Sequence, residues 1–272
     1  MIRTKTKEEI EILREGGKIL AQILDLVAKE VKPGIKTDEL EKYACDLAEK
    51  AGAWPSFKQY KMHDGLIYPT ALCISPNDEI VHAPALPARI LNEGDIVGID
   101  VGLEFPVDKR YKTINKYSKH GGYFTDTART VAVGKISEEA KKLLIVTEAS
   151  LYQGIDQVKP GNTINDIGTA IQKYAESHNY SVVRSLVGHG VGHFVHEDPQ
   201  VPNFSIKNTG FRNLVLKPGL VIAIEPMVNI GDYEIKGNDD DFAIKTADGS
   251  LSAHFEHTVL VTEDGFEILT QI

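Results

Sequence analysis

The feature that most constrains this chain is an internal duplication. A stretch that begins VKPG and continues as a polar turn and a helical pattern occurs twice. Two strand patterns follow each copy. The first strand pattern ends in a carboxylate residue, and the second, which is β-branched, begins with one. The three matched pairs begin at Val31 and Val158, at Leu91 and Leu216, and at Asp126 and Glu256. Because the pairs keep one order at offsets of 125 to 130 residues, we predict two related halves, at about 31–134 and 158–264.

In each half a helical pattern precedes β-branched strand patterns, which predicts an α/β (α+β) fold. We expect a pseudo-two-fold, curved antiparallel sheet with one face covered by helices. It forms a single domain over residues 1–272, because no low-complexity linker separates the halves. Thr6 opens a capping box before a helix to about Glu30, and Ser137, Thr37 and Thr163 mark other helix starts. Strands are expected at 71–74, 96–101, 123–133, 221–228 and 254–261.

The composition excludes several classes of protein. The chain is 42% hydrophobic, and no run of about 18 apolar residues predicts a transmembrane helix. The first residues lack the apolar stretch of a secretory signal, and two cysteines, Cys45 and Cys73, are too few for a disulfide framework. These features predict a cytoplasmic protein with no membrane partner. The net charge of −9 disfavours broad binding to nucleic acid.

Three histidines lie in a glycine-rich segment, GHGVGHFVHEDP, which runs from Gly188 to Pro199. Its glycines have low helix propensity, so His189, His193 and His196 are expected on a bent strand or loop. That placement argues against a helical HExxH zinc site, in which two ligands need i, i+4 spacing. Imidazole is the commonest metal ligand and titrates near neutral pH, so the segment is a candidate site. A glycine-rich surface turn with solvated histidines is the alternative interpretation.

Four carboxylates occupy equivalent places in the two halves, beside apolar strands. They are Asp100, Asp126, Glu225 and Glu256. If the halves fold together about a two-fold axis, the four acids converge, and their repulsion is relieved by a pair of divalent metal ions. Oxygen ligands with one imidazole suit Mn, Fe, Co or Zn better than a thiolate-rich structural zinc site does. The alternative is that each acid is a surface residue at the end of a strand.

Motifs that span nearly the whole chain resemble those of the type I methionine aminopeptidases, a family with the pita-bread fold. The matching motifs are CISPNDEIVHAP, GDIVGIDVG, TDTARTVAVG, GHGVGHFVHEDPQV, AIEPMV and SAHFEHTVLVTEDGFEILT. The resemblance implies a metalloprotease that removes the initiator methionine from nascent polypeptides, by attack of metal-activated water on the first peptide bond.

The same resemblance implies roles for the acids and for one histidine. Asp100 would chelate one metal ion, and Asp126 and Glu256 would bridge both ions. His189 and Glu225 would complete the second ion's ligands, and Glu225 would also move the proton of the attacking water. The resemblance therefore implies two divalent ions in each chain.

Further residues are implied to contact the substrate. His82 and His196 would hold the substrate's amide and stabilise the developing oxyanion. The family's methionine pocket corresponds to Tyr68, Cys73, Val195 and Phe242, with Tyr60 or Met62 as further candidates. Val195 and Phe242 stand where the family usually has phenylalanine and tryptophan. His193 has no family role and is expected at the surface or beside the ligands.

The chain departs from the family between Asp100 and Asp126. Their separation of 26 positions is longer than usual and predicts an inserted basic hairpin at about 104–122. Its basic residues within 109–120 are Lys109, Arg110, Lys112, Lys116 and Lys119. They form an exposed hairpin tip, or the hairpin shapes the entrance to the active site or contacts ribosomal RNA. The alternatives to the main function are a proline-directed aminopeptidase of the same fold and a non-catalytic binding protein. We expect a monomer.

Overall fold

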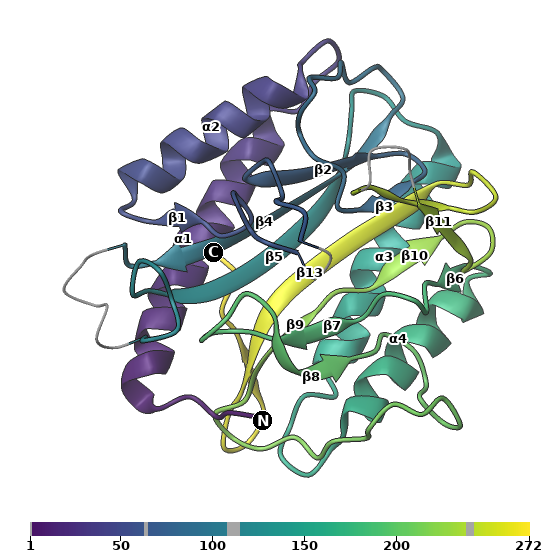
Figure 1. Ribbon diagram of the computed structural model, residues 1–272. Helices are drawn as coiled ribbons and strands as arrows, with labels where there is room; N and C mark the ends of the chain where they lie inside the picture. Colours follow the sequence, from purple (N-terminus) through teal and green to yellow (C-terminus); the bar gives the residue numbers. More distant parts are fainter. Residues whose placement is uncertain (1, 63–64, 108–114, 238–241) are drawn as a thin grey trace.

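The computed structural model describes residues 2–62, 65–107, 115–237 and 242–272. The helices are α1 (Lys7–Glu30), α2 (Thr37–Lys50), α3 (Glu138–Ile155) and α4 (Ile164–Ser177). Along the chain, α1 and α2 precede strands β1 to β5, and α3 and α4 precede strands β6 to β14, as Figure 1 shows. In the described part of the chain, no helix is long and apolar enough to cross a membrane.

Local capping signals explain where three of the four helices begin. The Thr6 side chain accepts the N–H of Glu9, whose carboxylate accepts the N–H of Thr6, so the predicted capping box is confirmed. Ser137 and Thr163 are also N-caps, as predicted. Thr37 as an N-cap is wrong by one residue, because Lys36 is the N-cap of α2. The buried Thr37 hydroxyl instead donates a hydrogen bond of 2.6 Å to the carbonyl of Ala85.

The strands form one large antiparallel sheet and one small sheet. The large sheet runs in the order β1-β4-β5-β13-β9-β7-β8, with β2, β6, β10 and β14 paired at its side, and β11-β12-β3 form the small sheet. In chain order the strands are β1 (Trp54–Pro55), β2 (Leu72–Pro76), β3 (Glu79–Val81), β4 (Ile96–Phe105), β5 (Tyr123–Ala132), β6 (Ser181–Val182), β7 (Gly188–Gly190), β8 (Glu197–Val201), β9 (Val221–Ile224), β10 (Met227–Asn229), β11 (Ile235–Gly237), β12 (Ile244–Thr246), β13 (Ser252–Val261) and β14 (Phe266–Ile268).

The two related halves meet where β5 pairs with β13. β4 and β5 of the first half pair with each other, and β9 and β13 of the second half pair in the same antiparallel way. The sequence pattern put all four acids at the ends of strands, and for three of them this prediction is wrong. Asp100, Asp126 and Glu256 lie inside long strands, because β4 continues to Phe105 and β5 and β13 begin before their acids. Glu225 lies at the break between β9 and β10.

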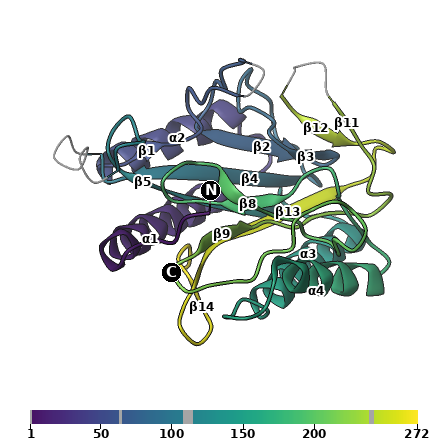
Figure 2. The ribbon, with the colours of Figure 1, turned by 60° about the horizontal axis from the view of Figure 1, so that its bottom comes forward.

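Alternation along the strands separates a helix face from an open face of the sheet. In β4 the side chains of Val97, Ile99 and Val101 join the apolar cluster of α1 and α2, so Asp100 points to the other face. In the second half, residues of β9 and β13 join the cluster of α3 and α4 in the same way. Figure 2 shows α1, α3 and α4 together on one side of the long strands. The predicted helix-covered antiparallel sheet is therefore confirmed.

Only the base of the inserted segment lies within the described residues. Asn115 is buried and donates hydrogen bonds to the carbonyls of Gly122 and His193. Lys116 and Lys119 are exposed. The other predicted basic residues, Lys109, Arg110 and Lys112, lie outside the described residues.

Candidate metal centre

The strand register brings the four carboxylates together on the open face. Asp100 in β4 and Glu256 in β13 both pair with Ala128 in β5, so they lie in one row with only a methyl group between them. Asp126 is two residues before Ala128 and points to the same face. Glu225 follows Ile224, the partner of His257, and so continues the row beside Glu256. Two acids from each half therefore converge, as the duplication predicts.

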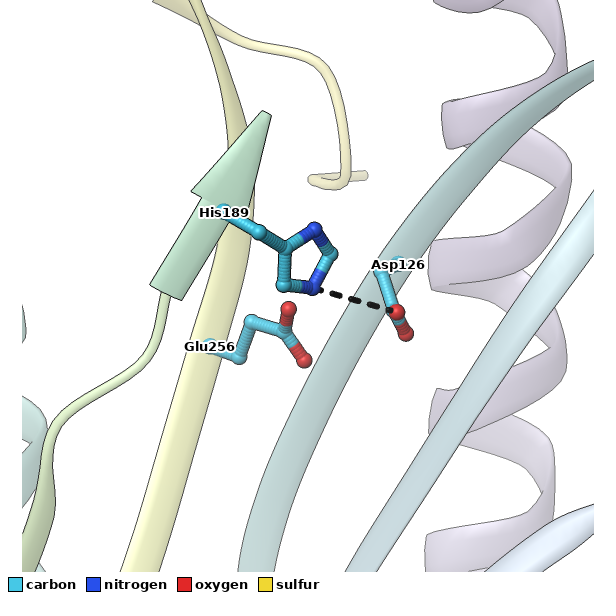
Figure 3. Close-up of side chains that lie close together, drawn as sticks. All are labelled: Asp126, His189 and Glu256. Atoms are coloured by element: carbon cyan, nitrogen blue, oxygen red, sulfur yellow. Dashed lines mark ion pairs between the residues drawn. The ribbon is translucent and has the colours of Figure 1, made fainter. Parts of the chain in front are cut away.

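One imidazole completes this cluster of acids. The His189 Nε2 atom lies 3.4 Å from Glu225 Oε1 and 4.0 Å from Asp126 Oδ2. The ligand atoms of Asp126, His189 and Glu256 all lie within 4.8 Å of one another, as drawn in Figure 3. These spacings leave room for a cation that all three side chains could contact.

The glycines beside His189 set its position. A Cβ atom at Gly188 would lie 2.3 Å from the carbonyl oxygen of Ala223, and one at Gly190 would lie 2.3 Å from that of Asp198. Only glycine permits this close packing of β7 between β9 and β8. The Nδ1 atom of His189 lies 2.9 Å from the carbonyl oxygen of Gly190, and this contact directs Nε2 toward the acids.

The electrostatics of the cluster favour a bound cation. Burial raises the pKa of Asp100 to about 7. Burial and the neighbouring acids also raise the pKa values of the Asp126, Glu225 and Glu256 carboxyls well above their usual range. In the described part of the chain, no group hydrogen-bonds the buried Oδ1 atom of Asp100. Four buried acids with an unpartnered oxygen and an adjacent imidazole fit divalent metal ions.

A cavity of about 440 Å³ opens over the acids. Its lining includes all five predicted ligands, the predicted substrate histidines and the predicted apolar residues Tyr60, Met62, Tyr68 and Cys73. His196 reaches the cavity from the loop after β7, and its Nδ1 atom lies 3.0 Å from the Tyr60 hydroxyl. Burial lowers the pKa of His82, which favours a neutral ring there.

Val195 and Phe242 are not among the described residues that line the cavity. Both belong to the apolar cluster around Tyr68, and the Phe242 and Tyr68 rings lie 5.6 Å apart. They therefore belong to the same apolar cluster as the cavity residue Tyr68 without lining the cavity themselves. The expectation that His193 lies at the surface or beside the ligands is corrected, because it is buried and its Nε2 atom lies 2.8 Å from Glu9 in α1.

The sequence interpretation missed several residues of this site. The additional lining residues are Phe57, Val81, Leu186, Val187 and Met227. His254 was also missed, although its Nε2 atom lies 3.9 Å from Glu225 Oε2. Its signal was the strand period, because a residue two positions before Glu256 points to the same face. The same rule puts His257 on the helix face, where its Nε2 atom lies 3.3 Å from the Tyr152 hydroxyl.

Comparison with known sequences identifies relatives over the full chain. The profile of metallopeptidase family M24 matches residues 11–263. Methionine aminopeptidase 1 of Bacillus subtilis is 45% identical over 273 residues and is matched over 100% of both chains. The methionine aminopeptidase of Escherichia coli K12 is 40% identical, with 99% of this chain and 94% of that protein covered.

Solved structures show the same fold. The crystal structure of methionine aminopeptidase from Thermotoga maritima matches with a TM-score of 0.88 and 40% identity, covering 100% of both chains. The prolidase from Pyrococcus horikoshii matches with a TM-score of 0.71 and 20% identity, and this chain covers 63% of it. The pita-bread fold expected from the sequence is thereby confirmed.

Proposed function

The chain belongs to metallopeptidase family M24 and is an aminopeptidase, and we propose that it removes the N-terminal methionine from polypeptides. The observation that carries this proposal is the cavity in which buried acids and histidines lie against apolar side chains. A polar floor suits hydrolysis of a peptide bond, and an apolar wall suits an uncharged, unbranched side chain such as methionine.

In this proposal five side chains would hold two divalent ions. Asp100 would bind one ion, Asp126 and Glu256 would contact both, and His189 and Glu225 would complete the ligands of the second. Bound divalent ions lower the pKa of a water molecule and offset the negative charge that develops on the carbonyl oxygen. Mn, Fe, Co and Zn all suit this set of oxygens and one imidazole.

The remaining polar groups act on the substrate. His82 and His196 line the cavity, and each can donate a hydrogen bond to the peptide group next to the scissile bond. Glu225 takes the proton of the attacking water and passes it to the leaving amine. The burial of the acids excludes bulk water, which strengthens each of these interactions.

Side-chain selectivity comes from the apolar part of the cavity. Tyr68 and Cys73 form its wall together with Tyr60 and Met62, and Val195 and Phe242 belong to the same apolar cluster as Tyr68. The side chain of an N-terminal methionine is flexible and polarisable, so it fills a pocket of this kind well.

The cellular setting belongs to the same proposal. We place the chain in the cytoplasm, as a monomer of one domain with an inserted basic hairpin at about 104–122, acting on polypeptides as they emerge. Within 109–120, the described lysines Lys116 and Lys119 are exposed and could meet ribosomal RNA.

A peptide panel with one metal tests this function. The metal-free protein is supplied with Co²⁺ and assayed on Met-Ala-Ser, Leu-Ala-Ser, N-acetyl-Met-Ala-Ser and Ala-Pro. We expect fast release of methionine from Met-Ala-Ser alone, because the pocket selects the side chain and the site needs a free amino terminus. Faster cleavage of Ala-Pro would instead support the proline-directed alternative. No cleavage of any peptide with Co²⁺ or Mn²⁺ would support a binding protein.

A further inference from the structure

A buried histidine that the proposed reaction does not use lies directly beside Glu225. His254 belongs to β13, and its side chain is 4% exposed. It is two residues before Glu256, so both side chains point to the open face of the sheet. Its partner across the sheet is Met227, which lines the cavity. The His254 ring therefore lies at the edge of the candidate metal centre.

The two oxygens of Glu225 face two different imidazoles. Oε1 lies 3.4 Å from His189 Nε2, and Oε2 lies 3.9 Å from His254 Nε2. Among the described residues, no group hydrogen-bonds the buried Nε2 atom of His254. A buried ring nitrogen without a partner is unfavourable, and a small side-chain movement would shorten 3.9 Å to hydrogen-bond length.

The backbone around His254 is fixed on both sides. The Thr130 hydroxyl accepts the N–H of His254 at 2.8 Å and donates to its carbonyl at 2.9 Å. These two bonds tie β13 to β5 at this residue. Any movement that brings Nε2 to Glu225 must therefore come from the side chains.

The two halves differ in how firmly their equivalent acids are held. Asp100 has a short side chain inside a regular strand, whereas Glu225 has one more rotatable bond and lies at the break between β9 and β10. A longer side chain loses more rotamer freedom when it is fixed. Glu225 therefore gains more than Asp100 from a neighbour that fixes its second oxygen.

We propose that His254 is a positioning residue whose Nε2–H donates a hydrogen bond to Glu225 Oε2 and so turns Oε1 toward the metal centre. This inference rests on the proposed function, because Glu225 must be a ligand for its orientation to matter. Hydrogen bonds of this kind fix metal-binding side chains and raise metal affinity.

Matched substitutions test the proposal through metal affinity as well as activity. His254→Leu removes the N–H, His254→Gln retains one, and His257→Leu is the control on the helix face of the same strand. Co²⁺ is titrated calorimetrically into each metal-free protein. We expect His254→Leu to weaken Co²⁺ binding by about 10–100-fold and to lower kcat similarly, with KM nearly unchanged. His254→Gln and His257→Leu should stay within about threefold of the wild type.

Two results would overturn the proposal. One is wild-type Co²⁺ affinity and kcat in His254→Leu, and the other is equal impairment of His254→Gln and His254→Leu, which would assign the effect to ring packing. If the wild type itself bound no Co²⁺, the result would contradict the proposed metal-dependent function rather than the role of His254. The titrations therefore separate the two failures.

A measurement on the wild type covers the case in which His254→Leu does not fold. In ¹⁵N-histidine-labelled, Zn²⁺-loaded protein, the His254 ring signals are assigned by their loss in His254→Gln. We expect a slowly exchanging proton on Nε2, because that atom is the donor. A proton on Nδ1 with an unprotonated Nε2 would contradict the proposal.

Discussion

The strands that carry the acids repeat between the two halves of the molecule, whereas the segments that flank them do not. Beside the first-half strands, residues 57–73 supply the cavity with Phe57, Tyr68 and Cys73. Beside the second-half strands, residues 186–196 supply it with His189 and His196. The repeated core thus provides a symmetric set of carboxylates. The first-half flank adds aromatic and apolar side chains, and the second-half flank adds His189 and His196 beside the apolar Leu186 and Val187.

This difference shows how a duplicated scaffold can acquire a directed reaction. The two related halves bring equivalent acids to one face of the sheet. A site made of these acids alone would be symmetric, so it would not favour one orientation of a bound substrate over the other. The flanks break the symmetry because one binds a side chain and the other completes a metal site. The following predictions test which properties belong to the core and which to each flank.

The largest effects are expected in the shared core. Asp126→Asn and Glu256→Gln each remove a proposed bridging ligand, one from each half. Both should lower kcat/KM by more than about 100-fold, beyond the loss typical of residues that only support a ligand. The assay is Met-Ala-Ser hydrolysis with metal content measured in parallel. Asp46→Asn, on the exposed face of α2, is the control.

Equal losses of kcat/KM and of bound metal in the two variants would confirm that the two halves contribute alike to the metal site. If Asp126→Asn kept wild-type metal content and activity while Glu256→Gln lost both, the symmetric description of the core would be wrong.

The second prediction isolates the histidine flank. His189→Gln removes the imidazole that faces both Asp126 and Glu225. Metal affinity and kcat should both fall by about 100-fold, the upper end of the loss typical of residues that only support a ligand, while the preference for methionine over leucine peptides stays the same. Calorimetric Co²⁺ titration and the peptide panel measure the two properties. A changed preference with intact metal affinity would assign His189 to substrate binding instead.

The sequence predicted those parts of the molecule that depend on local chemistry or on the repeat. The capping box at Thr6 involves residues three positions apart, so it was visible without the fold. The duplication predicted that the four acids would converge. Thr37 was misplaced by one residue because its hydroxyl bonds the distant Ala85 carbonyl, a contact that no local pattern reports.

Contacts between distant segments could not be predicted. His193 is buried because Glu9, 184 residues away, meets its ring. Phe57 and Leu186 line the cavity although neither lies in a motif. His254 faces Glu225 only because β9 and β13 pair in a particular register. Such positions depend on strand pairing, which a single sequence does not display.

The third prediction isolates the apolar flank. Tyr68→Leu shortens one wall of the cavity and leaves the acids in place. The ratio of kcat/KM for methionine over leucine peptides should fall by about 10-fold, since a methylene-sized change of fit corresponds to roughly 1–3 kcal/mol. Co²⁺ affinity should not change. A lost Co²⁺ affinity would show that this flank is not separate from the metal site.

The smallest effect concerns stability without metal. Because burial raises the pKa of Asp100 to about 7 and also raises that of Glu225, the folded metal-free protein binds more protons than the unfolded chain. This contribution to stability is fully present below the unfolded pKa of about 4 and is lost as the pH rises through the folded values.

Thermal melts in EDTA at pH 5 and pH 8 measure this effect. The Tm of the wild type should fall at pH 8 by a few degrees more than that of Asp100→Asn or Glu225→Gln, which cannot ionise at these positions. If the pH dependence of Tm were reduced equally in both variants, the equivalent acids of the two halves would contribute alike to stability. If the Tm of the wild type had the same pH dependence as that of both variants, the raised pKa values of Asp100 and Glu225 would be contradicted.

The central claim is that acids from both halves hold the metal ions together. The most direct measurement is the anomalous scattering of a crystal of the Mn²⁺-loaded protein. We predict two peaks about 3.5–4 Å apart, with carboxylate oxygens of both Asp126 and Glu256 within about 2.0–2.4 Å of each ion. A single ion, or ions bound by the acids of one half only, would contradict the account.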